Sequence, residues 1–293
     1  LGTGGGGNLQ ENIEIYKRHV LALNRLLMAH AAPFDAAISF SDFKQKGFKP
    51  VRSRDLIRAA EQPERNPFYN YYESELLPHI KTAAPRSIGI SLIYLNQALC
   101  AFALIGMVRR ELPDAKIILG GGLVTSWMQQ PGWQSPFGDW VDVMLAGKGE
   151  PALLDHFGIQ HPKGVHYAPD FQQVDFSAYI SPGKILPVTT SYGCYWRKCN
   201  FCPECAEGNA YDPVPRQLVI RHLQSAIAEQ QPSLVHFLDN ALDGPMLRQL
   251  IETKLNTPWY GYVRFEPFLT NLEFCRELKN SGCVMLQLGL ESG

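Results

Sequence analysis

Short apolar runs alternate with amphipathic helical patterns along two regions of the chain. In the first region, residues 87–95 and 115–122 are apolar runs, and the helical pattern of residues 96–112 lies between them. A buried strand, a crossover helix and another buried strand form a βαβ unit, which predicts a parallel sheet covered on both faces. Residues 140–157 then predict a third strand, a glycine-rich turn and a helix with Glu150 in its first turn, where a carboxylate complements the helix dipole. The pattern predicts a Rossmann-like domain.

The second region repeats strand and helix at short intervals. Its last three apolar strands start near Leu234, Trp259 and Val284, so they are 25 residues apart. That spacing accommodates one strand and one helix per repeat. It is typical of a β/α barrel of which the first four strands are present. The expected strands are residues 184–192, 234–238, 259–265 and 284–290, and the expected helices are residues 215–229, 244–254 and 271–280.

The other segments set the expected domain boundaries. Residues 158–184 carry several proline turns and no sustained period, which is typical of a linker. Residues 8–32 have apolar positions at helical spacing, and residues 66–80 predict a helix lined with aromatic side chains. We therefore expect a Rossmann-like domain over residues 1–160 with an irregular or helical first part, a linker over 161–184, and the N-terminal part of a (β/α)6 barrel over 185–293, truncated after its fourth strand.

Composition narrows the class of protein. The chain has 293 residues, enough for two domains, and its 27 lysines and arginines against 28 acidic residues give a net charge of -1. No global electrostatic field would recruit nucleic acid or an anionic membrane, so we expect neither partner. The longest apolar run, residues 98–108, is shorter than the ~20 residues of a membrane span, and no charged-then-apolar leader is present. We expect a cytoplasmic protein.

Four of the seven cysteines lie in the stretch "GCYWRKCNFCPEC", residues 193–205. They are Cys194, Cys199, Cys202 and Cys205, separated by four, two and two residues. Such clustering favours metal binding in a reducing compartment over a disulfide framework, and it is too dense for cysteines that merely pack. Thiolates are soft ligands that suit zinc or an iron–sulfur cluster.

Two metal-binding interpretations remain open beside a catalytic cluster. A structural zinc site usually pairs two C-x-x-C knuckles across a gap of ~12–20 residues, and this loop has no such gap. A four-thiolate electron-transfer cluster could be completed by Cys205. The loop, however, follows the first barrel strand at its carboxyl end, where β/α barrels place their active sites. A cluster held there by three thiolates keeps one iron open for chemistry on a bound ligand.

The stretch "SYGCYWRKCNFC" after a strand resembles the cluster loop of radical S-adenosylmethionine enzymes. The commonest family spacing has three and then two residues between cysteines, whereas here the first gap holds four. The resemblance implies that Cys194, Cys199 and Cys202 hold a 4Fe-4S cluster and that the fourth iron chelates the amino and carboxylate groups of S-adenosylmethionine. It also implies that Phe201 lies near the adenine, with Cys205 an additional thiol.

Polar residues follow the other predicted strands. They are Asp239, Asn240 and Asp243 after the second strand, Arg264 and Glu266 after the third, and Glu291 and Ser292 after the fourth. The ending "GLESG" resembles the end of strand four in the family, where polar side chains meet the ribose or the methionyl group. The family's Gly-Gly-Glu after strand two is absent, and Asp239 is the candidate substitute. By this resemblance Asp239, Arg264, Glu291 and Ser292 are expected to contact S-adenosylmethionine.

The first region carries a second resemblance. "GISLIY", "ILGGG" and "DVMLAGKGE" are similar to the cobalamin-binding Rossmann-like domain that precedes the barrel in one large branch of the family. The resemblance implies that Ser91, Gly120, Gly121 and Gly122 line the groove for the nucleotide tail, where a bare backbone permits close approach. The branch's Asp-x-His-x-x-Gly motif is missing, so cobalt would lack a protein histidine or the domain would have lost the cofactor.

Together these resemblances imply a radical S-adenosylmethionine enzyme. A 4Fe-4S cluster would cleave S-adenosylmethionine reductively to modify an unactivated carbon, and cobalamin would deliver a methyl group there. The expected partners are a small-molecule or peptide substrate and an electron donor such as flavodoxin or ferredoxin. The alternatives are a radical enzyme without cobalamin and a non-catalytic protein that binds cobalamin or zinc.

Overall fold

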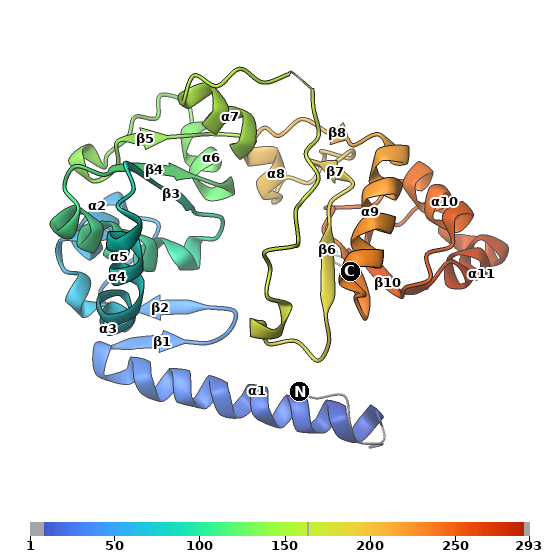
Figure 1. The fold of residues 1–293 in the computed structure, drawn as a ribbon, viewed down its shortest axis with the longest axis horizontal. Helices are drawn as coiled ribbons and strands as arrows, with labels where there is room; N and C mark the ends of the chain where they lie inside the picture. The colour runs from blue at the N-terminus through green and yellow to red at the C-terminus, as the bar shows by residue number, and fades with distance from the viewer. Residues whose placement is uncertain (1–8, 163, 290–293) are drawn as a thin grey trace. The chain divides into compact units, whose positions relative to one another are not determined.

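The structure is a computed structural model that describes residues 9–162 and 164–289. The described chain separates into two compact units, of which the first ends at His161 and the second begins at Pro162. Each unit contains a parallel β-sheet with helices in its connections (Figure 1). The predicted mixed α/β class is therefore confirmed.

The first unit is built on a three-stranded parallel sheet in the order β3-β4-β5. Ile117 and Leu119 on the central strand are fully buried, and Phe102 of the crossover helix is fully buried beside them in the same core. The strand–helix–strand pattern predicted over residues 87–122 is confirmed, as is the helix that contains Glu150 in its first turn. The elements are β3 (Ser87–Ser91), α5 (Ala98–Glu111), β4 (Lys116–Gly120), α6 (Gly122–Met128), β5 (Val143–Met144) and α7 (Gly149–His156).

The segment before this sheet is a long helix, a short hairpin and several helical turns. The helices predicted over residues 8–32 and 66–80 are confirmed, the second with a π-helical turn at its centre. The hairpin was not predicted, because strands of three residues are too short to show a period. Helix α2 was not predicted either. The elements are α1 (Leu9–Ala31), β1 (Ala36–Ile38), β2 (Phe43–Gln45), α2 (Ser53–Glu61), α3 (Tyr69–Tyr71), the π turn (Tyr72–Leu76) and α4 (Leu77–Ala83).

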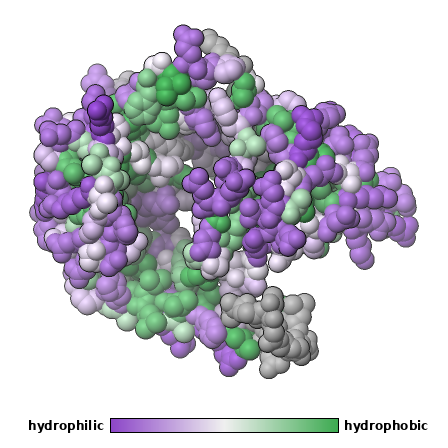
Figure 2. All heavy atoms as spheres, viewed as in Figure 1, coloured by the Kyte–Doolittle hydropathy of each residue, from purple (hydrophilic) through white to green (hydrophobic). Residues whose placement is uncertain are grey.

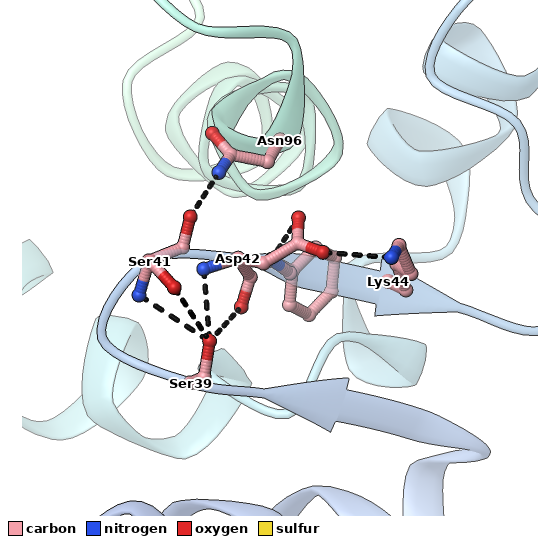
Figure 3. Close-up of polar contacts among 6 residues, drawn as sticks. Ser39, Ser41, Asp42, Lys44 and Asn96 are labelled. Atoms are coloured by element: carbon pink, nitrogen blue, oxygen red, sulfur yellow. Dashed lines mark hydrogen bonds and ion pairs between the residues drawn. The ribbon is translucent and has the colours of Figure 1, made fainter.

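This segment contacts both the crossover helix α5 and the loop after β3. Helices α2 and α5 approach so closely that a Cβ on Gly106 would lie 1.9 Å from the carbonyl oxygen of Ala60, so only glycine fits there. In the hairpin turn, Asn96 Nδ2 donates to the carbonyl oxygen of Ser41 at 2.9 Å (Figure 3). Asn96 belongs to the turn after β3, so the hairpin is tied to the loop at the carboxyl end of that strand.

Helix α1 exposes much of its apolar face. The large apolar side chains at least a third exposed are Ile13, Leu21, Leu23, Leu26 and Met28. Green, hydrophobic side chains are correspondingly visible along this part of the surface in Figure 2. Among the described helices, none is long enough and apolar enough to cross a membrane.

The second unit contains a four-stranded parallel sheet in the order β11-β10-β9-β6. Every strand and helix predicted after residue 184 is confirmed, with boundaries that differ by a few residues. That these elements are the N-terminal part of a (β/α)6 barrel, truncated after its fourth strand, stays a prediction. The elements are β6 (Ile185–Val188), β7 (Ser191–Tyr192), α8 (Pro203–Ala206), β8 (Asp212–Pro213), α9 (Arg216–Gln230), β9 (Leu234–Phe237), α10 (Gly244–Thr253), β10 (Trp259–Val263), α11 (Leu272–Asn280) and β11 (Cys283–Leu288).

Alternate residues of these strands form the core of the second unit. Val235, Phe237, Trp259 and Val263 are buried and pack with side chains of α9, α10 and α11. Residues between them in the strands, such as Tyr262, keep part of their surface exposed. Because the sheet is parallel, the loops after β6, β9 and β10 all leave from its same edge. The candidate site lies at this edge.

Candidate functional site

The cysteine loop leaves the sheet after β6 and returns through a short antiparallel pair. Ser191 and Tyr192 of β7 pair with Pro213 and Asp212 of β8, which brings the two ends of the loop together. Gly193 opens the loop with a φ of +70°, and a Cβ there would lie 2.5 Å from the carbonyl oxygen of Ala210. Glycine is therefore required where the outgoing and returning backbones meet.

All four thiols of the loop are free. Cys194, Cys199 and Cys202 are half-buried, and Cys205 is exposed. The amide of Cys202 donates to the carbonyl of Cys199, and the amide of Cys205 donates to that of Cys202, both at 3.1 Å, so the last three cysteines lie on consecutive tight turns. Burial raises the pKa of Cys202, so this thiol would need a metal or a nearby cation to become a thiolate at neutral pH.

The chemistry of these donors fits an iron–sulfur cluster. In the described parts of the chain, no three histidine, cysteine or acidic side chains converge closely enough to hold one metal ion. A cubane cluster has a different requirement, because each thiolate binds a separate iron atom. The loop at the carboxyl edge of the parallel sheet offers three separate free thiols, one for each of three iron atoms.

The end of β9 holds the outgoing side of the loop. Asp239 is only 2 % exposed, and its carboxylate accepts hydrogen bonds from the amide and hydroxyl of Thr190 and from the hydroxyl of Ser191. The two hydroxyl contacts measure 2.8 and 2.6 Å. Next to it, Asn240 Nδ2 donates to the carbonyl of Gly193 at 3.2 Å. Burial raises the pKa of Asp239, and the hydrogen bonds from Ser191 and Thr190 oppose that rise.

The returning side of the loop is held by the same strand end. The hydroxyl of Tyr211 donates to Asp243 Oδ2 at 2.9 Å. The other carboxylate oxygen of Asp243 accepts from the amide of Met246 at 2.7 Å and so caps helix α10. Burial raises the pKa of Tyr211, and its bond to Asp243 adds to the rise, so the phenol stays a donor. Both sides of the loop are thus attached to residues 239–243.

Residues that follow β10 contact the four-residue segment between Cys194 and Cys199. The hydroxyl of Tyr195 donates to Glu266 Oε1 at 3.0 Å, and the Cζ atom of Arg264 lies 3.8 Å from the centre of the Trp196 ring. Burial raises the pKa of Tyr195, and Glu266 adds to the rise. The four-residue gap, which departs from the commonest family spacing, therefore contributes two aromatic side chains that dock on the neighbouring strand end.

These contacts locate the residues that the sequence predicted for S-adenosylmethionine. Asp239 and Arg264 do lie at the edge with the cysteines, but both contact the loop itself. Phe201 is 67 % exposed. Glu291 and Ser292 lie outside the described residues. Contact of any of them with S-adenosylmethionine stays a prediction.

Sequence reasoning missed the residues that anchor the loop. They are Thr190, Ser191, Tyr195, Trp196 and Tyr211. Glu266 was expected as a polar residue after the third strand, but its partner Tyr195 was not. Two aromatic residues inside a cysteine-rich loop, followed by a cation, were the visible signal for the contact with β10. The hydroxyls after β6 carried no signal, because serine and threonine are common at the ends of strands.

The predicted cobalamin-groove residues also meet at one edge, in the first unit. Ser91 ends β3, Gly120 ends β4 beside it, and Gly121 and Gly122 lead into α6. The amide of Leu92 donates to the carbonyl of Gly120 at 2.7 Å. Gly121 has a φ of +106°, and a Cβ there would lie 2.5 Å from the carbonyl oxygen of Leu92. The loops after β3 and β4 touch through this glycine.

We expect Gly121→Ala to disrupt this edge and Gly120→Ala to leave it intact. The first change forces a side chain into the left-handed region and against a backbone carbonyl, so the free energy of unfolding should fall by about 2 kcal/mol. A Cβ on Gly120 would meet its nearest neighbour at 3.5 Å, an ordinary contact. Urea unfolding followed by circular dichroism would measure both variants, and equal stabilities would contradict the prediction.

The fold and site together define a two-unit α/β protein with a cysteine loop at the carboxyl edge of its second parallel sheet. No family model matches the chain, and no curated protein matches it. Among solved structures it is similar to the radical S-adenosylmethionine methyltransferase TsrM from Kitasatospora setae. The structure of TsrM with tryptophan substrate and the analogue aza-SAM gives a TM-score of 0.54 at 15% identity, covering 80% of this chain and 56% of that chain.

A second TsrM structure, with cobalamin and a [4Fe-4S] cluster bound, gives a TM-score of 0.55 at 16% identity and covers 75% of this chain and 53% of that chain. The chain thus spans just over half the length of TsrM. At this identity the likeness shows the fold, and it extends over most of the chain.

Proposed function

We propose that this chain belongs to a radical S-adenosylmethionine enzyme that modifies an unactivated carbon. The observation that carries the proposal is the cysteine loop. Three free thiols, whose spacing differs from the commonest family spacing by one residue in the first gap, lie on a segment that residues after β9 and β10 hold at the carboxyl edge of a parallel sheet. The similarity of the fold to a radical S-adenosylmethionine methyltransferase supports the same reading.

In this proposal each part of the site has a defined task. Cys194, Cys199 and Cys202 hold a 4Fe-4S cluster, which when bound and reduced supplies the electron that cleaves S-adenosylmethionine. Asp239 holds Thr190, which leads into the loop, and Arg264 holds Trp196 in the segment between the first two cysteines. The exposed ring of Phe201 offers a flat apolar face for the adenine. Glu291 and Ser292 are proposed as polar contacts to S-adenosylmethionine from resemblance alone.

Cobalamin belongs to the proposal as the methyl carrier. Ser91 and the three glycines at 120–122 lie at the carboxyl edge of the first sheet, where open α/β sheets bind nucleotide-like ligands. The structural neighbour TsrM was solved with cobalamin bound. The acceptor would be a small molecule, as tryptophan is for the neighbour, or a peptide.

A product assay tests the proposed function. The chain, reconstituted anaerobically with iron and sulfide, is incubated with S-adenosylmethionine and a chemical reductant, with and without hydroxocobalamin. We expect 5′-deoxyadenosine, or S-adenosylhomocysteine when cobalamin is added, and neither product without reductant. Absence of both products from protein that holds its cluster would contradict the proposal. Zinc in place of iron after purification would favour a zinc-binding protein instead.

A further inference from the structure

A cluster that receives electrons needs a place where the electron carrier can dock. The cysteine loop carries an exposed, positively charged tip beside its first two cysteines. Trp196 is 37 % exposed, and the adjacent Arg197 and Lys198 are also exposed. Because the whole chain has a net charge of only -1, this tip is a local feature and not part of a general basic surface.

Two cations lie close to the Trp196 ring. Lys198 Nζ lies 4.5 Å from the ring centre, and the Cζ atom of Arg264 lies 3.8 Å from it. Cation–π contacts of this kind fix both the ring and the charges in place. We refer to Trp196, Arg197 and Lys198 as the loop tip.

The nearby acidic side chains contact other residues and form no ion pair with the two charges of the tip, within the part of the chain that the structure describes. Glu266 accepts from Tyr195 and lies 3.9 Å from Arg264 Nε, so it offsets the charge of Arg264. Glu204 and Glu207 lie beyond Cys202 in the loop, and both accept from Asn209. No ion pair of Arg197 or Lys198 is found within residues 9–162 and 164–289.

The backbone of the tip is held in an unusual conformation. Arg197 has a φ of +50°, in the left-handed region that residues other than glycine seldom adopt. Docking of Tyr195 on Glu266 and of Trp196 on Arg264 holds the residues before it in place. Strained residues held by their surroundings are concentrated at functional sites. Here the strained residue presents its charged side chain to solvent between two of the proposed cluster ligands.

We propose that the loop tip is the docking surface for an acidic one-electron carrier protein. The inference rests on the proposed function, since it needs a cluster on Cys194, Cys199 and Cys202. Opposite charge steers such a carrier to the tip, and the exposed part of the indole adds an apolar contact there. One electron leaves the reduced carrier and enters the cluster, and no bond forms or breaks at the docking surface.

The primary experiment measures binding without the cluster. Fluorescence anisotropy of a labelled, oxidised flavodoxin is followed against the cluster-free full chain at about 20 mM salt, where surface charges are weakly screened. The charge-reversed variant Arg197→Glu/Lys198→Glu should bind at least about tenfold more weakly than the wild type, because attraction becomes repulsion. The neutral variant Arg197→Gln/Lys198→Gln should lie between the two.

A matched control separates the tip from net charge. Arg221→Glu/Arg248→Glu makes the same change in charge at two exposed helix positions on α9 and α10. It should bind flavodoxin within about twofold of the wild type if position, and not net charge, decides. Equal weakening by both charge-reversed variants, or no weakening by the tip variant, would overturn the proposal.

Rates of cluster reduction in the reconstituted protein show whether a failure concerns this docking surface or the proposed function. Photoreduced deazaflavin, a small uncharged donor, should reduce the cluster equally in the wild type and the tip variant. Reduced flavodoxin should reduce the wild type at least about tenfold faster than the tip variant at low salt. Equal rates with flavodoxin would refute the docking surface alone, whereas a wild type that binds no cluster would refute both proposals.

Discussion

Replacing Cys194, Cys199 or Cys202 with serine is expected to remove nearly all cluster iron and its visible absorption from the reconstituted chain. A serine hydroxyl is a hard and weakly acidic ligand that does not replace a soft thiolate on iron. Each single variant should therefore lose at least about 90 % of the bound iron. Iron and sulfide analysis, with absorption and electron paramagnetic resonance spectra of the reduced protein, would measure the loss.

Two further serine variants decide how the loss is interpreted. Cys275→Ser changes a half-buried thiol of helix α11, which donates to the carbonyl of Leu269, and should keep the iron of the wild type. Cys205→Ser should also keep it if three thiolates hold the cluster, with one iron open for S-adenosylmethionine. Loss of iron in the Cys205 variant would indicate a four-thiolate electron-transfer cluster. Full iron content in all three ligand variants would refute the assigned site.

The regular elements of the fold could be predicted because their patterns are long. The run 115–122 buries Ile117, Ile118 and Leu119 in succession, whereas the run 87–95 buries only Leu92 fully. Both strands and the helix between them were nevertheless correctly predicted. The hairpin of β1 and β2 has only three residues in each strand, and it depends on contacts such as that between Asn96 and Ser41. A contact across 55 residues leaves no local signal in the sequence.

The candidate site could also be predicted only in part. The cysteines could be identified from residue type and spacing, since few other roles need four thiols in thirteen residues. The partners of the loop could not, because they follow from strand register. Val188 of β6 pairs with Phe237 of β9, and this register brings Thr190 opposite Asp239 two residues later. The sequence indicated that polar residues end these strands but not which side chains they meet.

The second prediction with a large expected effect concerns Asp239, which this register places opposite Thr190. Its carboxylate is buried and accepts from three donor groups of Thr190 and Ser191. In Asp239→Asn, an amide that donates replaces one of the two accepting oxygens and faces a backbone or hydroxyl donor. The free energy of unfolding should fall by about 2–3 kcal/mol, the cost of unsatisfied buried polar groups. Urea unfolding at neutral pH would measure this fall.

Asp243→Asn is the matched control, with the same change in charge four residues away. Asparagine caps helices nearly as well as aspartate, so its carbonyl oxygen can keep the bond from the amide of Met246. Its amide group then faces the hydroxyl of Tyr211, which can accept as well as donate, so the stability of this variant should stay within about 0.5 kcal/mol of the wild type. Hydrogen exchange distinguishes loss of loop anchoring from general destabilisation. In Asp239→Asn, protection should fall most over residues 190–194, which lead into the first cysteine, while α10 and α11 keep theirs. A uniform loss of protection across the second unit would show that Asp239 stabilises the whole unit without a particular role in holding the cysteine loop.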